Sequence, residues 1–182
     1  MSATLVLGGA RSGKSSHAEA LAIASGREVV YIATARSGDT EMAARIAQHR
    51  SQRPQHWRTV EQPLYLAQAI QDFSTQHNLV LVDCLTLWLS NLLFSSGADY
   101  PDVGPVTLPP LFAQERSALL QALQNAAGEV ILVSNEVGMG IVPMGAVSRC
   151  FLDEAGRLNQ AVAAVCERAV FVAAGLPLRL KG

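Results

Sequence analysis

Residues 8–15, GGARSGKS, have the composition of a loop that binds phosphate. The glycines Gly8 and Gly13 let backbone N–H groups curl around phosphate oxygens. Lys14 can then reach the β and γ phosphates, and Ser15 can ligate Mg²⁺. Four mostly apolar residues precede the loop and a helical pattern follows it, which is the context that a triphosphate loop requires. The pattern predicts a nucleoside triphosphate site, and a glycine-rich turn that only caps a helix is the alternative.

A carboxylate stands where a second ligand for such a site is expected. In NLVLVDCLT, Asp83 comes directly after four apolar residues that predict a buried strand. An acidic residue at the end of a neighbouring strand can hold Mg²⁺ through water, so Asp83 is the predicted partner of Ser15 at a metal site. The alternative is an aspartate that caps the helix after the strand.

A histidine lies among arginines in DTEMAARIAQHRSQRP, residues 39–54. If residues 41–53 are helical, Arg45, His49 and Arg53 recur every four residues on one face. Neighbouring positive charges favour the neutral imidazole, which is the nucleophilic form, and the guanidinium groups attract phosphate oxygens. His49 is therefore a candidate base or covalent phosphorus acceptor. A solvated basic helix face explains the same residues.

Polar residues follow two further apolar runs. The segment YIATAR leaves Ala33, Thr34, Ala35 and Arg36 at the end of one predicted strand. The segment SNEVGMGIVP leaves Asn135 and Glu136 at the end of another. Ligands of open α/β sheets bind at this rim, so both segments predict a second substrate near the nucleotide. An ordinary turn is the alternative for each.

Short apolar runs alternate with helical patterns along the chain. The predicted strands are residues 4–7, 29–32, 79–82, 130–133 and 170–173. The predicted helices cover residues 16–24, 41–50, 64–73, 86–94 and 111–126, and a long one lies within 146–168. Such alternation favours parallel pairing with right-handed crossovers, and hence an α/β fold in which helices flank a mainly parallel sheet. Residues 95–110, rich in Pro and Gly, predict a long surface loop.

Length and composition narrow the remaining choices. A chain of 182 residues is most simply one domain, residues 1–182, and a formal net charge of -1 provides no basic field for nucleic acid. The three cysteines show neither paired spacing nor a zinc pattern, which fits a reducing cytoplasm. No export signal is recognised, and residues 79–94, the most hydrophobic segment, fall short of a membrane span. A cytoplasmic protein without stable membrane insertion is expected.

Six motifs occur in one order across nearly the whole chain. They are GGARSGKS…AE (8–19), YIATA (31–35), EMAARIAQHRSQRPQHWRTVEQP (41–63), DCLTLWLSNLL (83–93), SNEVGMGIVP (134–143) and AGRLNQ (155–160). Together they resemble the bifunctional adenosylcobinamide kinase/adenosylcobinamide-phosphate guanylyltransferase family of cobalamin assembly. The resemblance implies a P-loop NTPase fold of the recombinase type and a homo-oligomer, a ring of three subunits.

The resemblance implies two reactions. A nucleoside triphosphate, ATP or GTP, first phosphorylates the aminopropanol hydroxyl of adenosylcobinamide. A histidine then attacks the α-phosphorus of GTP and releases pyrophosphate, and the guanylylated enzyme transfers GMP to adenosylcobinamide phosphate. The product is adenosylcobinamide-GDP. The guanylylated histidine of the family belongs to an HRxxRP segment, which maps to His49 of this chain.

Other roles carry over one position at a time. Nucleotide binding is implied for Gly8, Gly9, Ala10, Arg11, Ser12, Gly13, Lys14, Ser15, Ala33, Thr34, Ala35, Arg50, Ser51, Gln52, Arg53, Glu61 and Asp83. Glu61 matches a carboxylate suited to accept the guanine N1 and N2 hydrogens, and Lys14 and His49 are the implied catalytic residues. After RCF the family pattern has Arg-Asp where this chain has Leu152 and Asp153, a departure that concerns corrinoid or subunit contacts more than nucleotide chemistry.

Two other functions use the same loop. A small-molecule kinase without guanylyl transfer would use Arg45, Arg50 and Arg53 only to clamp phosphates. A nucleotide-driven ring ATPase or switch would hydrolyse nucleotide in response to a partner, and the histidine segment has no evident role in it.

Overall fold

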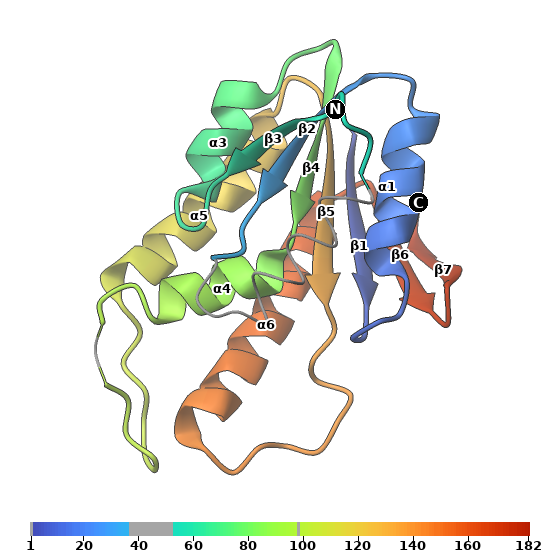
Figure 1. Ribbon diagram of the computed structural model, residues 1–182. Helices are drawn as coiled ribbons and strands as arrows, with labels where there is room; N and C mark the ends of the chain where they lie inside the picture. The colour runs from blue at the N-terminus through green and yellow to red at the C-terminus, as the bar shows by residue number, and fades with distance from the viewer. Residues whose placement is uncertain (1, 37–52, 98) are drawn as a thin grey trace.

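The computed structural model describes residues 2–36, 53–97 and 99–182 of the chain (Figure 1). The described strands form one sheet in the order β3-β2-β4-β5-β1-β6-β7. They are β1 (Ala3–Gly8), β2 (Glu28–Ala33), β3 (Arg58–Glu61), β4 (Asn78–Asp83), β5 (Glu129–Asn135), β6 (Arg168–Ala173) and β7 (Leu176–Lys181). The described helices are α1 (Lys14–Ala24), α3 (Leu66–Phe73), α4 (Leu85–Leu93), α5 (Pro110–Asn125) and α6 (Ala146–Val165).

The sheet is parallel from β3 through β6, and the pair β6–β7 is antiparallel. The predicted α/β fold with a mainly parallel sheet is therefore confirmed. Parallel neighbours need crossover connections, and helices such as α1 after β1 and α6 after β5 provide them. Each of the five predicted strands is present, with bounds that differ by one or two residues. The helix predicted at residues 41–50 lies outside the described residues.

The sequence does not predict β3 or β7. β3 has four residues and none of them is fully buried, while β7 contains Pro177 and is exposed along its whole length. Both strands lie at the edges of the sheet. An edge strand contacts solvent on at least one side, so it does not need the continuous apolar run that marks a central strand.

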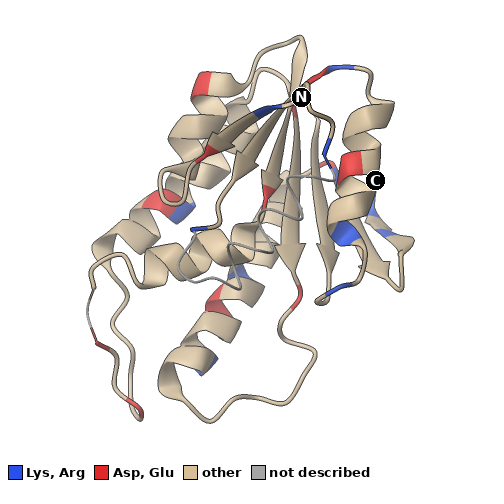
Figure 2. Cartoon of the chain, viewed as in Figure 1, with Lys and Arg blue, Asp and Glu red and all other residues tan. Residues whose placement is uncertain are grey.

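The apolar core forms on both faces of the sheet. In β4, Val80 and Val82 join the core that includes residues of α3, α4, α5 and α6, whereas Leu79 and Leu81 join the core beneath α1. This follows from the two-residue period of a strand whose two faces are both covered. Figure 2 shows that charged residues of the four central strands stand at the strand ends.

The carboxyl ends of four neighbouring strands meet at one rim. β1 ends at Gly8, which pairs with Asn135 at the end of β5, and β2 ends at Ala33, which pairs with Asp83 at the end of β4. Among these four described strands, Asp83 is the one charged residue at that rim. The sheet therefore brings the predicted phosphate loop and the predicted metal carboxylate to the same side.

Candidate active site

The predicted phosphate loop joins β1 to α1 in a tight turn that requires glycine. A Cβ on Gly8 would lie 2.4 Å from Ser12 Oγ and 2.5 Å from the carbonyl oxygen of Val172. Gly13 begins α1 with a φ of 92°, a left-handed backbone that side chains disfavour. The non-glycine Arg11 also has a positive φ, 55°. The loop is thus coiled so closely that a side chain at Gly8 would displace its neighbours.

The turn between β6 and β7 supports the loop from the side. The N–H of Gly175 donates a hydrogen bond of 2.8 Å to the carbonyl oxygen of Ser12. A Cβ on Gly13 would lie 3.1 Å from the Cα of Gly175, so the two backbones pack directly against each other. Ala174 and Gly175 both have positive φ, 51° and 77°. A two-residue hairpin turn with positive φ at both positions matches the right-handed twist of the two strands that it joins.

Lys14 is the buried cation of the site. Its side chain is 9% exposed, and Nζ donates a hydrogen bond of 3.2 Å to the carbonyl oxygen of Gly9 within the loop. Burial lowers the pKa of Lys14, and the nearby Cys84 thiol and Asp83 carboxylate partly offset that effect. A cation that is removed from water in this way interacts strongly with an incoming phosphate.

The first turn of α1 adds backbone donors to this cation. No described side chain caps the helix, and its first turn contains no acidic residue. The N–H groups at the start of a helix lack partners within the helix and carry the positive end of its dipole. Ser15, half-buried in this turn, and the exposed Ala10 and Arg11 of the loop complete the surface that an anion would meet.

Asp83 lies two strands from the phosphate loop, because β5 separates β4 from β1. Two strand spacings are about 9.5 Å, a distance that a hydrated cation and a phosphate group can span. The carboxylate is half-buried and interacts with Tyr31. Burial, followed by the charge and hydrogen bond of Asp83, raises the pKa of Tyr31, so this phenol stays protonated and serves as a donor.

Thr34 fixes the corner after β2 and β4. Its hydroxyl donates to the carbonyl oxygen of Cys84 at 2.7 Å and accepts from the N–H of Cys84 at 2.9 Å. Its own N–H donates to the carbonyl of Asp83, and its carbonyl accepts from Asn91 Nδ2 at 2.7 Å. Every polar group of Thr34 is therefore engaged within the chain, and the residue positions Asp83. Its neighbours Ala33 and Ala35 are half-buried at the same rim.

Arg53 lies against the same part of the molecule. Its guanidinium carbon lies 3.5 Å from the centroid of the Tyr31 ring, and Nε lies 3.8 Å from Glu19 Oε1. Its side chain is 9% exposed, and Nε has no hydrogen-bond partner among the described residues. Guanidinium groups bind phosphate oxygens well, so Arg53 is a candidate phosphate ligand at this edge of the site. The predicted residues His49, Arg50, Ser51 and Gln52 lie outside the described residues.

Glu61 is not close to the phosphate loop. It ends β3 in an exposed position and pairs with Ala33. β3 is four strands away from β1, which corresponds to about 19 Å across the sheet. The structure thus brings together Lys14, Ser15, Asp83 and Arg53, and it places Glu61 at the far end of the same rim.

A polar network behind the loop extends the site beyond the predicted residues. Ser134 Oγ donates to Asn159 Oδ1 at 2.7 Å, and Asn159 Nδ2 donates to the carbonyl of Asn135 at 3.3 Å. Asn135 Nδ2 in turn donates to Thr86 Oγ1 at 3.0 Å. The sequence pattern already predicts Asn135 as a polar residue at the end of a strand. Asn159 stands in the AGRLNQ motif, but no spacing in the sequence shows that it reaches β5.

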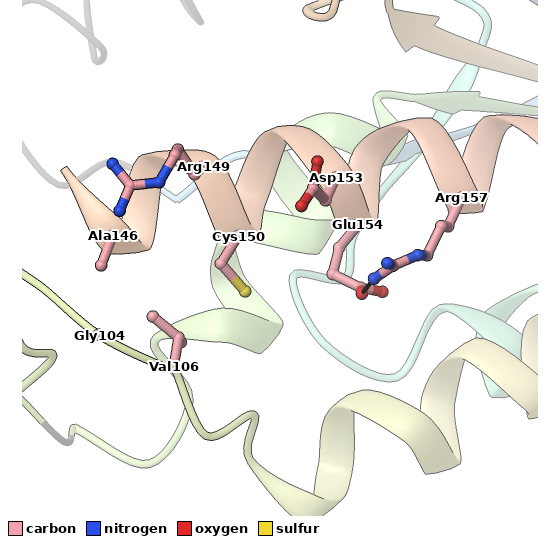
Figure 3. A pocket seen from close by; sticks show the side chains of 8 residues that line it. All are labelled: Gly104, Val106, Ala146, Arg149, Cys150, Asp153, Glu154 and Arg157. Atoms are coloured by element: carbon pink, nitrogen blue, oxygen red, sulfur yellow. Dashed lines mark hydrogen bonds and ion pairs between the residues drawn. The ribbon is translucent and has the colours of Figure 1, made fainter. Parts of the chain in front are cut away.

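A cavity beside α6 belongs to another region. Its volume is about 220 Å³, and it lies between one face of α6 and the segment that contains Gly104 and Val106. Figure 3 labels the residues that line it. Glu154 lies there in contact with Arg157 and 3.2 Å from Arg116, so its charge is paired within the protein. None of the lining residues belongs to the phosphate loop or contacts it in the interactions described above.

Comparison with known proteins identifies the family. Residues 4–180 match the family described as cobinamide kinase / cobinamide phosphate guanyltransferase. The chain belongs to this family. The cobinamide kinase / cobinamide phosphate guanyltransferase family comprises transferases, so the predicted enzyme class and the resemblance seen in the motifs are confirmed.

Two relatives support this assignment, and one solved structure shares the fold. The bifunctional adenosylcobalamin biosynthesis protein CobP of Pseudomonas aeruginosa is 53% identical over 178 residues, which are 98% of this chain and 96% of that protein. CobU of Escherichia coli K12, described in the same words, is 45% identical over 97% of this chain and 98% of its own length. An ATPase from the type III secretion system of pathogenic bacteria shares the fold, with a TM-score of 0.54 and 13% identity. This chain covers 56% of that ATPase, which in turn matches 98% of this chain.

Proposed function

We propose that the protein phosphorylates the aminopropanol hydroxyl of adenosylcobinamide and then adds GMP from GTP, giving adenosylcobinamide-GDP. The observation that carries the proposal is the family match over nearly the whole chain, combined with a sheet whose rim holds both the loop with Lys14 and Ser15 and the strand end with Asp83. In this proposal residues 8–15 bind the triphosphate. Ala33 to Ala35 and Arg50 to Arg53 bind nucleotide, and Glu61 receives the guanine base.

In the kinase step, the hydroxyl oxygen of the acceptor attacks the γ-phosphorus. A new P–O bond forms, the bond from the γ-phosphorus to the β,γ-bridging oxygen breaks, and the nucleoside diphosphate leaves while the hydroxyl proton is released. Lys14 and the N–H groups at the start of α1 stabilise the charge on the phosphates. The buried position of Lys14 strengthens this effect because water screens its charge less.

In the guanylyl step, a ring nitrogen of His49 attacks the α-phosphorus of GTP. The P–N bond forms as the α,β-bridging bond breaks, and pyrophosphate leaves. A phosphate oxygen of adenosylcobinamide phosphate then attacks the same phosphorus, and the electrons of the P–N bond return to the imidazole. GMP thus passes from GTP to adenosylcobinamide phosphate in two displacements through the histidine, and the two anionic substrates do not have to react with each other directly.

The anchor of Arg53 supports this role for His49. His49 lies four positions before Arg53 in the sequence, and four residues of chain span at most roughly 14 Å. Arg53 is held between Tyr31 and Glu19 at the edge of the site next to α1. The buried guanidinium is also placed to bind a phosphate oxygen during the transfer.

The residues at the rim fit Mg²⁺. The hydroxyl of Ser15 and the carboxylate of Asp83 are hard oxygen donors, and Mg²⁺ in phosphate sites takes its remaining ligands from phosphates and water. No group of three or more His, Cys, Asp or Glu side chains gathers among the described residues, in keeping with an ion that the protein holds by few ligands. When bound, the ion would neutralise phosphate charge. Asp83→Asn tests this assignment through the Mg²⁺ concentration that gives half-maximal activity, which should rise.

The decisive experiment is a mass measurement after incubation with GTP and Mg²⁺. We expect one added GMP per chain, labile in acid and stable in base, that peptide mapping locates at His49. His49→Ala should abolish the adduct, and the matched control His56→Ala, at an exposed histidine seven residues away, should keep it. Label that persists in His49→Ala would refute the histidine route. If γ-phosphate is transferred to adenosylcobinamide but no GMP adduct forms, the protein is a kinase without guanylyl transfer.

The oligomeric state and the compartment are part of the same proposal. We infer a homo-oligomer, a trimer by family resemblance. The exposed Leu176, Leu178 and Leu180 on edge strand β7 are apolar side chains that a subunit contact would cover. Sedimentation equilibrium checks the trimer. The three cysteines are all free thiols, which supports the proposed cytoplasmic location. No described helix is long and apolar enough to cross a membrane.

A further inference from the structure

The loop after β5 presents apolar side chains to solvent beside the phosphate loop. Met139, Ile141, Val142 and Met144 are 78%, 98%, 63% and 91% exposed. Four largely exposed apolar side chains within six residues are unusual for a surface loop and mark a binding surface. The loop contains the SNEVGMGIVP motif, and the nucleotide chemistry described above makes no use of these four side chains.

The ends of this loop are fixed. Its start is tied to the phosphate loop, because the N–H of Glu136 donates to the carbonyl oxygen of Gly8 at 3.0 Å. The Glu136 carboxylate accepts from the N–H of Gly138 at 2.7 Å. At the other end Arg149 donates to the carbonyl oxygens of Pro143 and Met144. The apolar residues between these ties are therefore held out on a defined arch.

The arch forms one wall of an apolar groove of about 380 Å³. The other walls are the end of α4 and the first turns of α6. The lining residues are Ser90, Leu93, Phe94, Val137, Ile141, Pro143, Val147, Ser148, Phe151 and Leu152. None of them carries a charge, in contrast to the cavity of Figure 3 on a different face of α6, where Arg149, Asp153 and Glu154 take part.

The position of the groove relates it to the transferred phosphate. Val137, which lines it, directly follows Glu136, whose N–H is bonded to Gly8. A ligand in the groove therefore begins about two residues of chain, roughly 7 Å, from the phosphate loop. That is within reach of a flexible arm that carries a hydroxyl group to the γ-phosphorus.

We infer that this groove binds the corrin macrocycle of the acceptor, adenosylcobinamide, on its methyl-bearing edge. The inference rests on the proposed function and names the place of its second substrate. The lining without charged side chains is complementary to a ring whose side chains are uncharged amides, and Ser90 and Ser148 offer hydroxyl groups to such amides. The unbranched methionines of the arch adapt to an irregular ring surface. A groove of this size takes one edge of the macrocycle and leaves the rest in solvent.

The test compares two isoleucine substitutions. Ile141→Ser removes the most exposed apolar side chain of the arch, and Ile23→Ser is the matched control at a 59% exposed position near the end of α1. Kinase assays give KM for adenosylcobinamide and for the nucleotide separately. We expect Ile141→Ser to raise KM for adenosylcobinamide about tenfold, because one buried aliphatic contact is lost, and to leave KM for nucleotide unchanged. Ile23→Ser should change neither value.

A second variant fills the groove instead of emptying it. Ser148→Trp places a large ring at an exposed lining position and should weaken adenosylcobinamide binding by a similar factor. Equilibrium dialysis of adenosylcobinamide measures that binding without any turnover. The GMP adduct formed from GTP alone should be the same in wild type, Ile141→Ser and Ser148→Trp, because that step does not use the groove.

These readouts separate the inference from the proposed function. If the wild type forms no GMP adduct but Ile141→Ser still weakens adenosylcobinamide binding, guanylyl transfer is refuted and the groove assignment stands. Binding that is equal in wild type and both variants would overturn the groove. Sedimentation velocity of each variant without ligand adds the remaining outcome: dissociation of the oligomer by Ile141→Ser would show that the arch is a subunit contact and would also overturn the inference.

Discussion

The N–H of Gly175 and the carbonyl oxygen of Ser12 are joined by a hydrogen bond of 2.8 Å, which links the β6–β7 turn to the middle of the phosphate loop. The contact is between backbones, and a Cβ on Gly13 would lie only 3.1 Å from the Cα of Gly175. The shape of the phosphate loop therefore depends on a hairpin that is more than 150 residues away in the chain. A disturbance of that hairpin should appear first in nucleotide binding.

Gly175→Ala tests this dependence. The φ of 77° disfavours alanine, so we expect the free energy of unfolding to fall by about 1 kcal/mol and KM for nucleotide to rise several-fold. Ala174→Gly is the control in the same turn, because it relieves a φ of 51° without touching Ser12. It should stabilise the protein slightly and leave KM unchanged. A Gly175→Ala protein that is less stable but binds nucleotide normally would contradict the proposed support.

The lowered pKa of Lys14 predicts a loss of nucleotide affinity at a pH below the one at which an ordinary lysine deprotonates. Only the protonated amine attracts phosphate, and burial shifts its deprotonation below the ordinary value of 10.5. Affinity should therefore fall as pH rises through the lowered pKa, and Lys14→Arg, which stays charged, should lack this decline. Isothermal titration in two buffers of different ionisation enthalpy should show proton uptake on binding. A pH-independent affinity in the wild type would contradict the assignment.

The lowered pKa of Lys14 affects the stability of the fold in the opposite direction to nucleotide affinity. Because the folded state holds the Lys14 proton less tightly than the unfolded state, the unfolded chain binds more protons between the lowered pKa and 10.5. The free energy of unfolding contributed by this residue thus rises with pH in that window. Urea titrations of wild type and Lys14→Met across the window should differ with this trend.

Arg53 and Arg58 form a matched pair for testing the role of the buried guanidinium. Arg53 stacks on Tyr31 at 3.5 Å beside the site, and Arg58 stacks on Phe73 at 4.5 Å away from it. Arg53→Met should slow formation of the GMP adduct by an order of magnitude, in line with the loss of a buried donor to phosphate. Arg58→Met should leave the rate unchanged. Equal losses in quench-flow measurements of both variants would point to a general destabilisation instead.

Thr34→Val removes the hydroxyl that holds Cys84 from both sides. Two buried hydrogen bonds of 2.7 and 2.9 Å are lost and the N–H of Cys84 is left without its partner, so we expect a loss of about 2 kcal/mol in the free energy of unfolding. Thr34→Ser keeps the hydroxyl and should lose less. Chemical denaturation measures both, and activity at limiting Mg²⁺ should fall more in the valine variant because Asp83 precedes this corner. Equal stability of the two variants would count against the positioning role.

The predictability of the site follows from how local each signal is. Gly8, Lys14 and Asp83 could be found in the sequence because their roles depend on a short loop or on the end of an apolar strand. Gly175 could not, because its contact with Ser12 depends on the order of strands in the sheet rather than on any spacing. Asn159 shows the same limit, since its bond to Ser134 joins two residues that are 25 positions apart on different elements.

The fold shows a similar division. The central strands are apolar on both faces, and this makes β4 and β5 visible as continuous runs. The edge strands β3 and β7 are exposed and contain polar or proline residues, so no run marks them. For Thr34, the sequence predicts the position at the rim, because the residue follows the apolar run of β2. The sequence does not predict its hydrogen bonds to Cys84, because these depend on how the ends of β2 and β4 pack together.

β1 lies between β5 and β6, so the strand that leads into the phosphate loop pairs with two strands that are synthesised much later. A nascent chain that has emerged as far as β4 lacks both neighbours of the strand that carries the phosphate loop. Nucleotide then has no complete phosphate-binding loop to bind, so it cannot stabilise the folded state until β5 and β6 have been made. Until then, the described strands that already have partners are β2, β3 and β4.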